Sequence, residues 1–216
     1  MSASHHPPED LLLAYAAGSL DEASSVLVAT HLALCPNCRH DVMHAEAVAG
    51  ELMEDLVPVQ LNGAALESAL ANLDAAPVAV SRVAAKAVDG VLPQPLRDYV
   101  SGELVNAKWQ WKGFGVQYAP LMTDPSGNKL GLLRVAAGVR VPHHGHSDDE
   151  LTMVLSGGYS SELGAFARGD IEFADEEVKH QPVADEDGPC LCLVVTRGPL
   201  KPTAIVASWL MPLLAF

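Results

Sequence analysis

Two groups of side chains in this sequence have the residue types and the spacing that bind metal ions. The first contains His31, Cys35 and Cys38, in a His-x3-Cys-x2-Cys pattern. His31 and Cys35 share one face of a helix, and the turn from Cys35 to Cys38 brings both sulfurs to one point. Two thiolates and an imidazole are three of the four ligands of a tetrahedral zinc site. We therefore expect zinc here, and not two reduced surface cysteines beside an unrelated histidine.

The fourth zinc ligand has to come from elsewhere in the same region. His5 and His6 stand just before the first expected helix and can fold back onto the turn. His40 and His44 are closer in sequence, but they lie further into the next helix and point around it or away from the turn. The spacing alone does not choose between His5 and His6.

The second group is a long motif in the C-terminal half of the chain. Gly138, His144–His146, Glu150 and Gly157 match the first cupin motif, G-x5-H-x-H-x3-E-x6-G, at every defined position. In a strand, the two histidines point to the same side, and Glu150 can approach the same point after a turn. Two imidazoles and a carboxylate suit a divalent first-row metal.

The second cupin motif supplies one more histidine. Gly169 and His180 keep its spacing, whereas Asp175 and Glu177 stand where cupins usually have Pro and Gly. That departure weakens the match at the turn and leaves His180 in place. The sequence therefore predicts a centre of three histidines and one glutamate, and not a set of solvated loop histidines.

Cys190 and Cys192 form a further pair on one expected strand, where alternation turns them to the same side. We interpret them as two small buried side chains. Oxidation sensing by this pair is the alternative, and nothing in the spacing requires it.

The elements that position these residues change class along the chain. Apolar periodicity predicts four helices in residues 1–76, at about 9–17, 21–34, 37–56 and 64–73. Ser19 has capping-box spacing to Glu22, and Pro36 suits the first turn of the third helix. Residues 77–96 are rich in Ala, Val and Pro and predict a linker. Alternating apolar residues and frequent turns in 97–216 predict many short strands, as in a sandwich or barrel.

We therefore expect an α+β protein of two domains. The N-terminal domain would be a four-helix zinc-binding bundle, and the C-terminal domain an all-β cupin barrel of the jelly-roll type. Four helices of this size bury little core, so a metal that ties them together has a clear physical role.

Composition and charge limit the partners and the location. Lys and Arg number 13 against 27 Asp and Glu, which gives a net charge of −14 with neutral histidines. Such a chain repels the phosphate backbone, which argues against direct nucleic-acid binding and favours a basic protein partner. No signal peptide and no run of about 18 apolar residues is visible, so we expect a cytoplasmic protein with reduced cysteines.

Taken together, these features resemble one family. His6 followed by His31–Cys38 between two helices resembles the zinc-binding anti-sigma domain, and Leu13–Gly18 and Ala29–Leu32 resemble the ChrR family in particular. That family joins such a domain to a C-terminal cupin, so the resemblance covers nearly the whole chain apart from the linker. It implies that His6, rather than His5, completes the zinc site.

The resemblance also implies a function. The family's N-terminal domain binds an extracytoplasmic-function sigma factor and blocks its contact with RNA polymerase core. A short last helix, here 64–73, helps to grip the sigma factor. The family is associated with the response to singlet oxygen, in which the cupin is needed for signalling and the anti-sigma domain alone inhibits. The resemblance therefore implies a regulatory protein that releases its sigma factor under oxidative stress.

Two other functions fit parts of the sequence. A centre of three histidines and one glutamate also serves cupin dioxygenases and isomerases, which usually use iron, manganese or nickel. No further acid, base or nucleophile is identifiable from spacing, and a small-molecule enzyme has no evident use for the helical zinc domain. A purely structural zinc adaptor is the third hypothesis.

Overall fold

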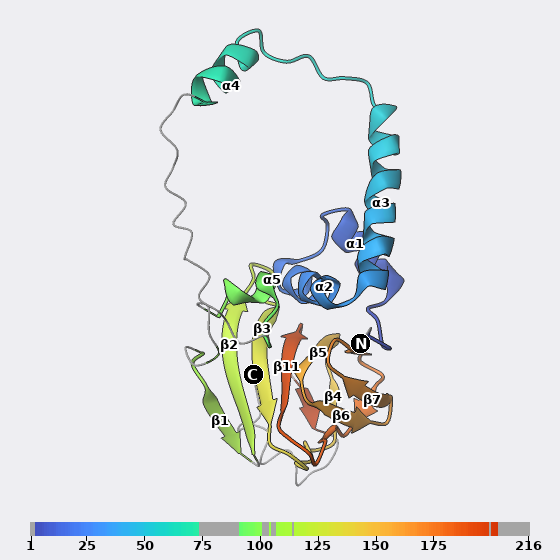
Figure 1. Cartoon of the computed structure of the whole chain (residues 1–216), viewed down its shortest axis with the longest axis vertical. Coiled ribbons are helices and arrows are strands. Elements are labelled where there is room, and N and C mark those ends of the chain that lie inside the picture. Colours follow the sequence, from blue (N-terminus) through green and yellow to red (C-terminus); the bar gives the residue numbers. More distant parts are fainter. Residues whose placement is uncertain are drawn as a thin grey trace.

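The computed structural model describes residues 3–73, 91–100, 104, 107–113, 115–198 and 200–202. Within these residues the helices come first and the strands follow, which confirms the expected α+β composition (Figure 1). The helices are α1 (Glu9–Ala16), α2 (Glu22–Leu34), α3 (Pro36–Glu54), α4 (Ala65–Leu73) and α5 (Gln94–Arg97). The strands are β1 (Gln110–Gly113), β2 (Val116–Thr123), β3 (Lys129–Val135), β4 (His144–His146), β5 (Glu150–Ser156), β6 (Gly158–Ser161), β7 (Gly164–Ala167), β8 (Ile171–Ala174), β9 (Lys179–His180), β10 (Val183–Ala184), β11 (Cys190–Thr196) and β12 (Leu200–Pro202). None of the helices in these ranges is long and apolar enough to cross a membrane.

Local signals explain where α2 and α3 begin. Asp21 caps α2, because its carboxylate accepts a hydrogen bond from the backbone N–H of Ser24 at 2.8 Å. The sequence pointed to Ser19 as the cap, and the structure corrects this, since Asp21 stands directly before the first helical residue. α3 begins at Pro36, whose missing N–H has no partner to lose in the first turn of a helix.

The N-terminal helices do not form a four-helix bundle. α1, α2 and α3 pack together around a small core. No side chain of α4 is buried, and the helix stands apart from the other three in Figure 1. The expectation of a bundle is therefore wrong for α4, whose apolar residues Leu66, Leu70 and Leu73 are 69%, 53% and 79% exposed. The helix has an apolar face, but the described part of the chain offers it nothing to pack against.

The strands form three antiparallel sheets within the described residues. The largest has the order β1-β2-β3-β11-β5-β8, and the two smaller ones are β10-β6-β7 and β12-β4-β9. Hydrogen bonding does not close them into a barrel, because the large sheet ends at β1 and β8 and the small sheets pair separately. The expected barrel is corrected to a cupin-like arrangement of open sheets.

Strand β11 lies in the middle of the large sheet and is buried on both faces. Its odd-numbered apolar residues belong to the core shared with the helices, and Cys190, Cys192 and Val194 belong to the core shared with the small sheet β10-β6-β7. This confirms that the two cysteines are buried on one side of a strand.

Helix α2 joins the helical and the β parts of the molecule. Ala23, Val26 and Leu27 pack in one core with the large sheet and with Leu92 and Leu96 at α5. The opposite side of α2 faces α1 and α3. Most of the predicted linker, at 77–90, lies outside the described residues, as do residues 203–216 and Phe114 of the predicted strand region.

Candidate metal centres

The first cluster lies where α2 meets α3 and the N-terminal arm folds back. One ligand atom from each of His6, His31, Cys35 and Cys38 lies within 4.8 Å of those of the other three. The Nδ1 atom of His6 is 3.2 Å from Sγ of Cys38 and 3.6 Å from Sγ of Cys35. Cys35 follows α2 and precedes α3 in an extended conformation, so the chain turns sharply and brings the two thiols beside the last turn of α2.

The other nearby histidines lie elsewhere. His40 and His44 are exposed on α3 and belong to no cluster. His5 turns toward the β part, where its ring centroid is 4.5 Å from that of Phe166. The arm therefore brings His6, and not His5, to the cysteines.

The surroundings of His31 are those expected of a metal ligand. Its Nδ1 atom is hydrogen-bonded to the backbone carbonyl of Gly169 at 2.8 Å, so Nδ1 carries the proton and Nε2 has the free electron pair. The side chain is fully buried, and Nε2 has no hydrogen-bond partner. A buried polar atom without a partner is costly, and burial lowers the pKa of His31, which keeps the ring neutral. A zinc ion would satisfy Nε2.

The thiols lie in a small core that an ion would reinforce. Burial raises the pKa of Cys38 to about 12, so the thiol keeps its proton until a cation takes its place. The core around the two cysteines consists of few side chains: Ala3, Leu12, Val28, Leu32 and Val42. A metal bond across this core adds stability that its apolar area alone does not provide.

The second cluster gathers His144, His146, Glu150 and His180, all buried and again within 4.8 Å by one ligand atom each. His144 and His146 are alternate residues of β4 and therefore face the same side. His180 in β9 is directly opposite His144 in the antiparallel register. Glu150 begins β5, and its carboxylate lies 3.6 Å from Nδ1 of His146.

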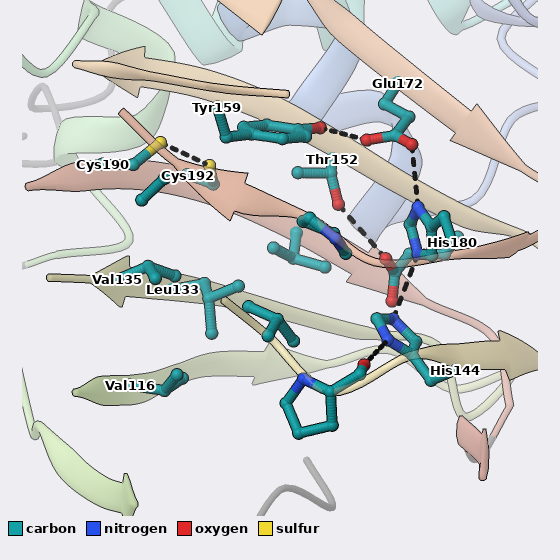
Figure 2. A pocket seen from close by; sticks show the side chains of 16 residues that line it. Val116, Leu133, Val135, His144, Thr152, Tyr159, Glu172, His180, Cys190 and Cys192 are labelled. Atoms are coloured by element: carbon teal, nitrogen blue, oxygen red, sulfur yellow. Dashed lines mark hydrogen bonds and ion pairs between the residues drawn. The ribbon is translucent and has the colours of Figure 1, made fainter. Parts of the chain in front are cut away.

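The three imidazoles converge through their Nε2 atoms. Nε2 of His180 is 3.1 Å from Nε2 of both His144 and His146. Nδ1 of His144 is hydrogen-bonded to the carbonyl of Pro142, and Nδ1 of His180 to the carboxylate of Glu172, each at 2.8 Å (Figure 2). These bonds orient the rings and leave Nε2 free as the ligand atom, which is the arrangement usual around metal-binding histidines.

Burial sets the protonation of this cluster. It lowers the pKa of His144 to about 4 and that of His146 to about 3, so both rings are neutral at neutral pH and able to bind a metal. Burial also raises the pKa of Glu150 to about 7, which a bound cation would reverse. Burial alone would raise the pKa of Glu172 too, but hydrogen bonds led by that from His180 outweigh it and lower this pKa.

Sequence reasoning missed Glu172. It is buried in β8 and accepts hydrogen bonds from Nδ1 of His180, from the Tyr159 hydroxyl and from Ser161. The signal available was a charged residue within the short apolar strand 171–174. A charged residue at an inward position requires a partner, and His180 is that partner.

In the second cupin motif, side-chain hydrogen bonds of Asp175 stabilise the turn that Pro and Gly usually form. The Asp175 side chain accepts hydrogen bonds from the backbone N–H groups of Glu177 and Val178, at 2.9 and 3.1 Å. Asp residues stabilise tight turns in this way, so the turn before β9 forms without the usual Pro and Gly. His180 consequently reaches the cluster.

An apolar cavity leads to the second cluster. The lining includes His144, Glu150 and His180 at the cluster and, away from it, apolar side chains such as Val116 and Val194. Cys190 and Cys192 also line it, with their Sγ atoms 3.5 Å apart (Figure 2). The site can hold a metal ion at the end of a cavity that is lined mostly by apolar side chains.

Comparison with known proteins agrees with this architecture. A family model described as the ChrR cupin-like domain matches residues 100–201, and a zinc-finger family model matches residues 9–39. The anti-sigma-E factor ChrR of Cereibacter sphaeroides is 42% identical over 214 residues, which is 98% of each chain. The crystal structure of Rhodobacter sphaeroides SigE in complex with the anti-sigma ChrR is similar with a TM-score of 0.81 and 42% identity. That match covers 90% of this chain and 100% of the other.

The fold and the two clusters thus define a protein that joins a zinc-finger domain to a cupin domain. Within that class, the chain belongs to the ChrR family of anti-sigma factors.

Proposed function

We propose that this protein is an anti-sigma factor that binds and inhibits an extracytoplasmic-function sigma factor and acts in the cytoplasm. The observation that carries the proposal is the 42% identity to an anti-sigma-E factor over 98% of both chains. Nearly the whole length of that relative is therefore represented here. The role is regulatory, and the clusters serve binding and sensing rather than turnover of a substrate.

The proposal divides the chain into the zinc-binding anti-sigma domain at 1–76, a linker at 77–96 and the cupin domain at 97–216. His6, His31, Cys35 and Cys38 would hold zinc in the first domain. The unpartnered Nε2 of buried His31 supports this, since an ion would satisfy it. When bound, zinc would tie the N-terminal arm to the junction of α2 and α3.

The second metal set is His144, His146, Glu150 and His180, which would hold zinc or another divalent first-row metal. Three imidazole nitrogens and a carboxylate oxygen suit several such metals, so the residues alone do not select one. The position of Nε2 of His180, 3.1 Å from Nε2 of both other histidines, supports the assignment.

The surface that would grip the sigma factor lies on the end of α3, on the connecting segment 55–64 and on α4. Large apolar side chains are exposed there at high fractions: Leu52, Met53, Leu56, Val57, Val59, Leu61, Leu66, Leu70 and Leu73. A continuous series of exposed apolar residues is typical of a partner-binding surface. In the complex of SigE with ChrR, a protein 42% identical to this chain is bound to a sigma factor, which supports the same kind of partner here.

Release of the sigma factor would follow oxidative stress, with singlet oxygen as the expected signal, sensed through the cupin domain. Thiolates and imidazoles are oxidisable, so both clusters contain groups that such a signal can change. The change would lower the affinity of the anti-sigma domain for its partner.

The test combines copurification with a release assay. A tagged full-length protein should retain an extracytoplasmic-function sigma factor co-expressed from the same genome, and elemental analysis should give two metal equivalents per chain. Combined replacement of His144, His146, Glu150 and His180 by Ala should preserve inhibition and abolish stress-dependent release. Failure to bind any such sigma factor would contradict the anti-sigma role. Normal release by the combined variant would instead leave only a structural role for the second cluster.

A further inference from the structure

One four-residue segment of the β part contacts both metal clusters. Gly169 and Asp170 form the turn before β8, and Ile171 and Glu172 are the first two residues of that strand. Gly169 and Asp170 face the N-terminal cluster, whereas Glu172 faces the cupin cluster. In Figure 1 the dark-blue start of the chain lies between the helices and the strands.

Gly169 and Asp170, at the N-terminal end of the segment, contact His31 and the arm that carries His6. The carbonyl of Gly169 accepts the hydrogen bond from Nδ1 of His31 at 2.8 Å. The carboxylate of Asp170 accepts hydrogen bonds from the backbone N–H groups of Ser4 and His5, at 2.6 and 3.0 Å. His6 is the next residue along that arm, so Asp170 fixes the backbone from which His6 reaches the cysteines.

The attachment of the arm continues through the backbone. The N–H of Ile171 donates to the carbonyl of His5 at 3.2 Å, so the backbone of the arm is bonded directly to the edge strand β8. Asp170 is 3% exposed, and its other oxygen accepts from the N–H of Ala167 at 2.8 Å. A buried carboxylate with this many donors is held rigidly and is costly to replace.

The other end of the segment holds the cupin cluster. Glu172 orients His180 through the 2.8 Å contact with Nδ1. The segment is also bonded to β5, since Val154 exchanges backbone hydrogen bonds with Gly169 and Asp170, at 2.9 and 3.0 Å. β5 begins with the cupin ligand Glu150, so two ligands of that cluster are connected to the same short stretch of backbone.

We propose that the segment Gly169–Glu172 couples the two clusters, with Asp170 as the positioning residue that transmits the state of the cupin cluster to the arm carrying His6. The inference rests on the proposed metal-binding role of the N-terminal cluster. A shift of His180 and Glu172 moves β8, and the movement reaches the arm because Asp170 and Ile171 are bonded to it directly. Coupling of this kind is reciprocal, and it disappears when the connecting contact is removed.

The experiment measures how fast Cys35 and Cys38 react with iodoacetamide in the full-length protein, with each site quantified by mass spectrometry of peptides. Zinc-bound thiolates react slowly, and peptide mapping separates these two from Cys190 and Cys192. Removal of metal from the wild type by a chelator should accelerate the reaction. If the chelator has no effect, the zinc assignment and the coupling both fail.

With that control in place, four proteins form a double-mutant cycle: the wild type, Asp170→Ala, His180→Ala and the double variant. Asp170→Ala should accelerate alkylation on the order of tenfold, because loss of a residue that orients a ligand weakens a metal site by about 10–100-fold. Asp170→Asn keeps one acceptor for Ser4 and His5 and should have a smaller effect. Asp187→Asn removes an exposed charge in the same domain and should have none.

The proposal is tested by comparing the effect of His180→Ala in the wild type with its effect in the Asp170→Ala protein. His180→Ala should accelerate alkylation several-fold when Asp170 is present and have no further effect in the Asp170→Ala protein. Equal acceleration in both backgrounds, or none in either, would overturn the coupling while leaving the zinc site established. If His180→Ala proves unstable by circular dichroism, His180→Gln, which conserves a polar side chain, replaces it in the same cycle.

Discussion

At the scale of single residues, each cluster depends on groups that bind no metal themselves. The carbonyl of Gly169 orients His31, the carbonyl of Pro142 orients His144, and Glu172 orients His180. Each partner accepts a hydrogen bond from Nδ1–H, which keeps the proton on Nδ1 and leaves Nε2 to act as the ligand atom. The pattern supports ligand roles for these rings, because it fixes each ring with Nε2 directed toward the other residues of its cluster.

His5 and His6 are adjacent but have different surroundings, which gives a matched pair of variants. His6→Ala should lose one zinc equivalent and lower the thermal stability of the protein, because the ion then lacks its fourth ligand. His5→Ala should retain the metal, since the backbone N–H that bonds to Asp170 is unchanged. Elemental analysis and thermal unfolding measure both effects. Loss of zinc by His5→Ala alone would contradict the assignment.

Zinc binding to the N-terminal cluster should release protons. Burial raises the pKa of Cys38 to about 12, and both thiols must ionise to bind zinc, so about two protons should leave per ion. Affinity should then fall about 100-fold for each unit by which the pH is lowered. Calorimetry in two buffers of different ionisation enthalpy gives the proton count. A His144→Ala protein, which lacks the cupin site, restricts the titration to one site.

Glu172 should tune the cupin metal without binding it. Glu172→Gln conserves the size of the side chain but removes the charge that favours the oriented form of His180, so metal affinity should fall about 10–100-fold. Competition with a chromophoric chelator measures this affinity. Glu176→Gln changes an exposed carboxylate nearby and should leave the affinity unchanged. Equal affinities for all three proteins would show that Glu172 has no influence on the site.

At the scale of elements, α4 differs from the other long helices. α1, α2 and α3 bury apolar residues within the chain, whereas α4 buries none. Its sequence has the apolar period of a packed helix, and that period led to the prediction of a four-helix bundle. Periodicity shows that a helix has an apolar face but not whether the face packs within the chain or on a partner.

The exposed face of α4 can be tested without disturbing the fold. Leu66→Glu combined with Leu70→Glu should weaken sigma-factor binding by at least tenfold, because buried apolar anchors dominate protein interfaces. Stability should change by less than about 0.5 kcal/mol, since both side chains are exposed. Leu163→Glu, at an exposed leucine of the cupin domain, is the control. Unchanged binding by the double variant would exclude α4 from the interface.

At the scale of the whole molecule, the two domains share a core instead of being separate units. Ala23, Val26 and Leu27 of α2 pack with the large sheet. Arg197 adds an ion pair to Asp21 at 3.0 Å and one to Asp149 at 3.4 Å, which ties the start of α2 to the β part. These charges are partly exposed and contribute little, so the apolar contacts dominate the docking.

A shared core should make unfolding cooperative. The metal-loaded protein should unfold in one calorimetric transition, and Leu27→Ala should lower the free energy of unfolding by about 2–5 kcal/mol. Leu13→Ala, at an exposed position of α1, should change it by less than about 0.5 kcal/mol. Two separate transitions in the wild type would show that the domains unfold independently.

Spacing along the chain was enough to predict seven of the eight ligands and the α+β order of the domains, because these depend on local motifs and periodicity. The eighth ligand, His6, came from the resemblance to the ChrR family, since spacing did not separate it from His5. The eight predicted ligands do gather in two clusters, and their binding of ions stays a prediction for the experiments above. Glu172, the Gly169 carbonyl at His31 and the docking of α2 on the sheet could not be read from spacing. The contact of His31 with Gly169 and the docking of α2 join residues distant in sequence, and the packing of α2 against β11, β3 and β5 brings them together. Glu172 is near His180 in sequence, but their contact depends on how β8 and β9 are placed. Local pattern places a side chain on a face, whereas only the packing of all the elements decides what that face meets.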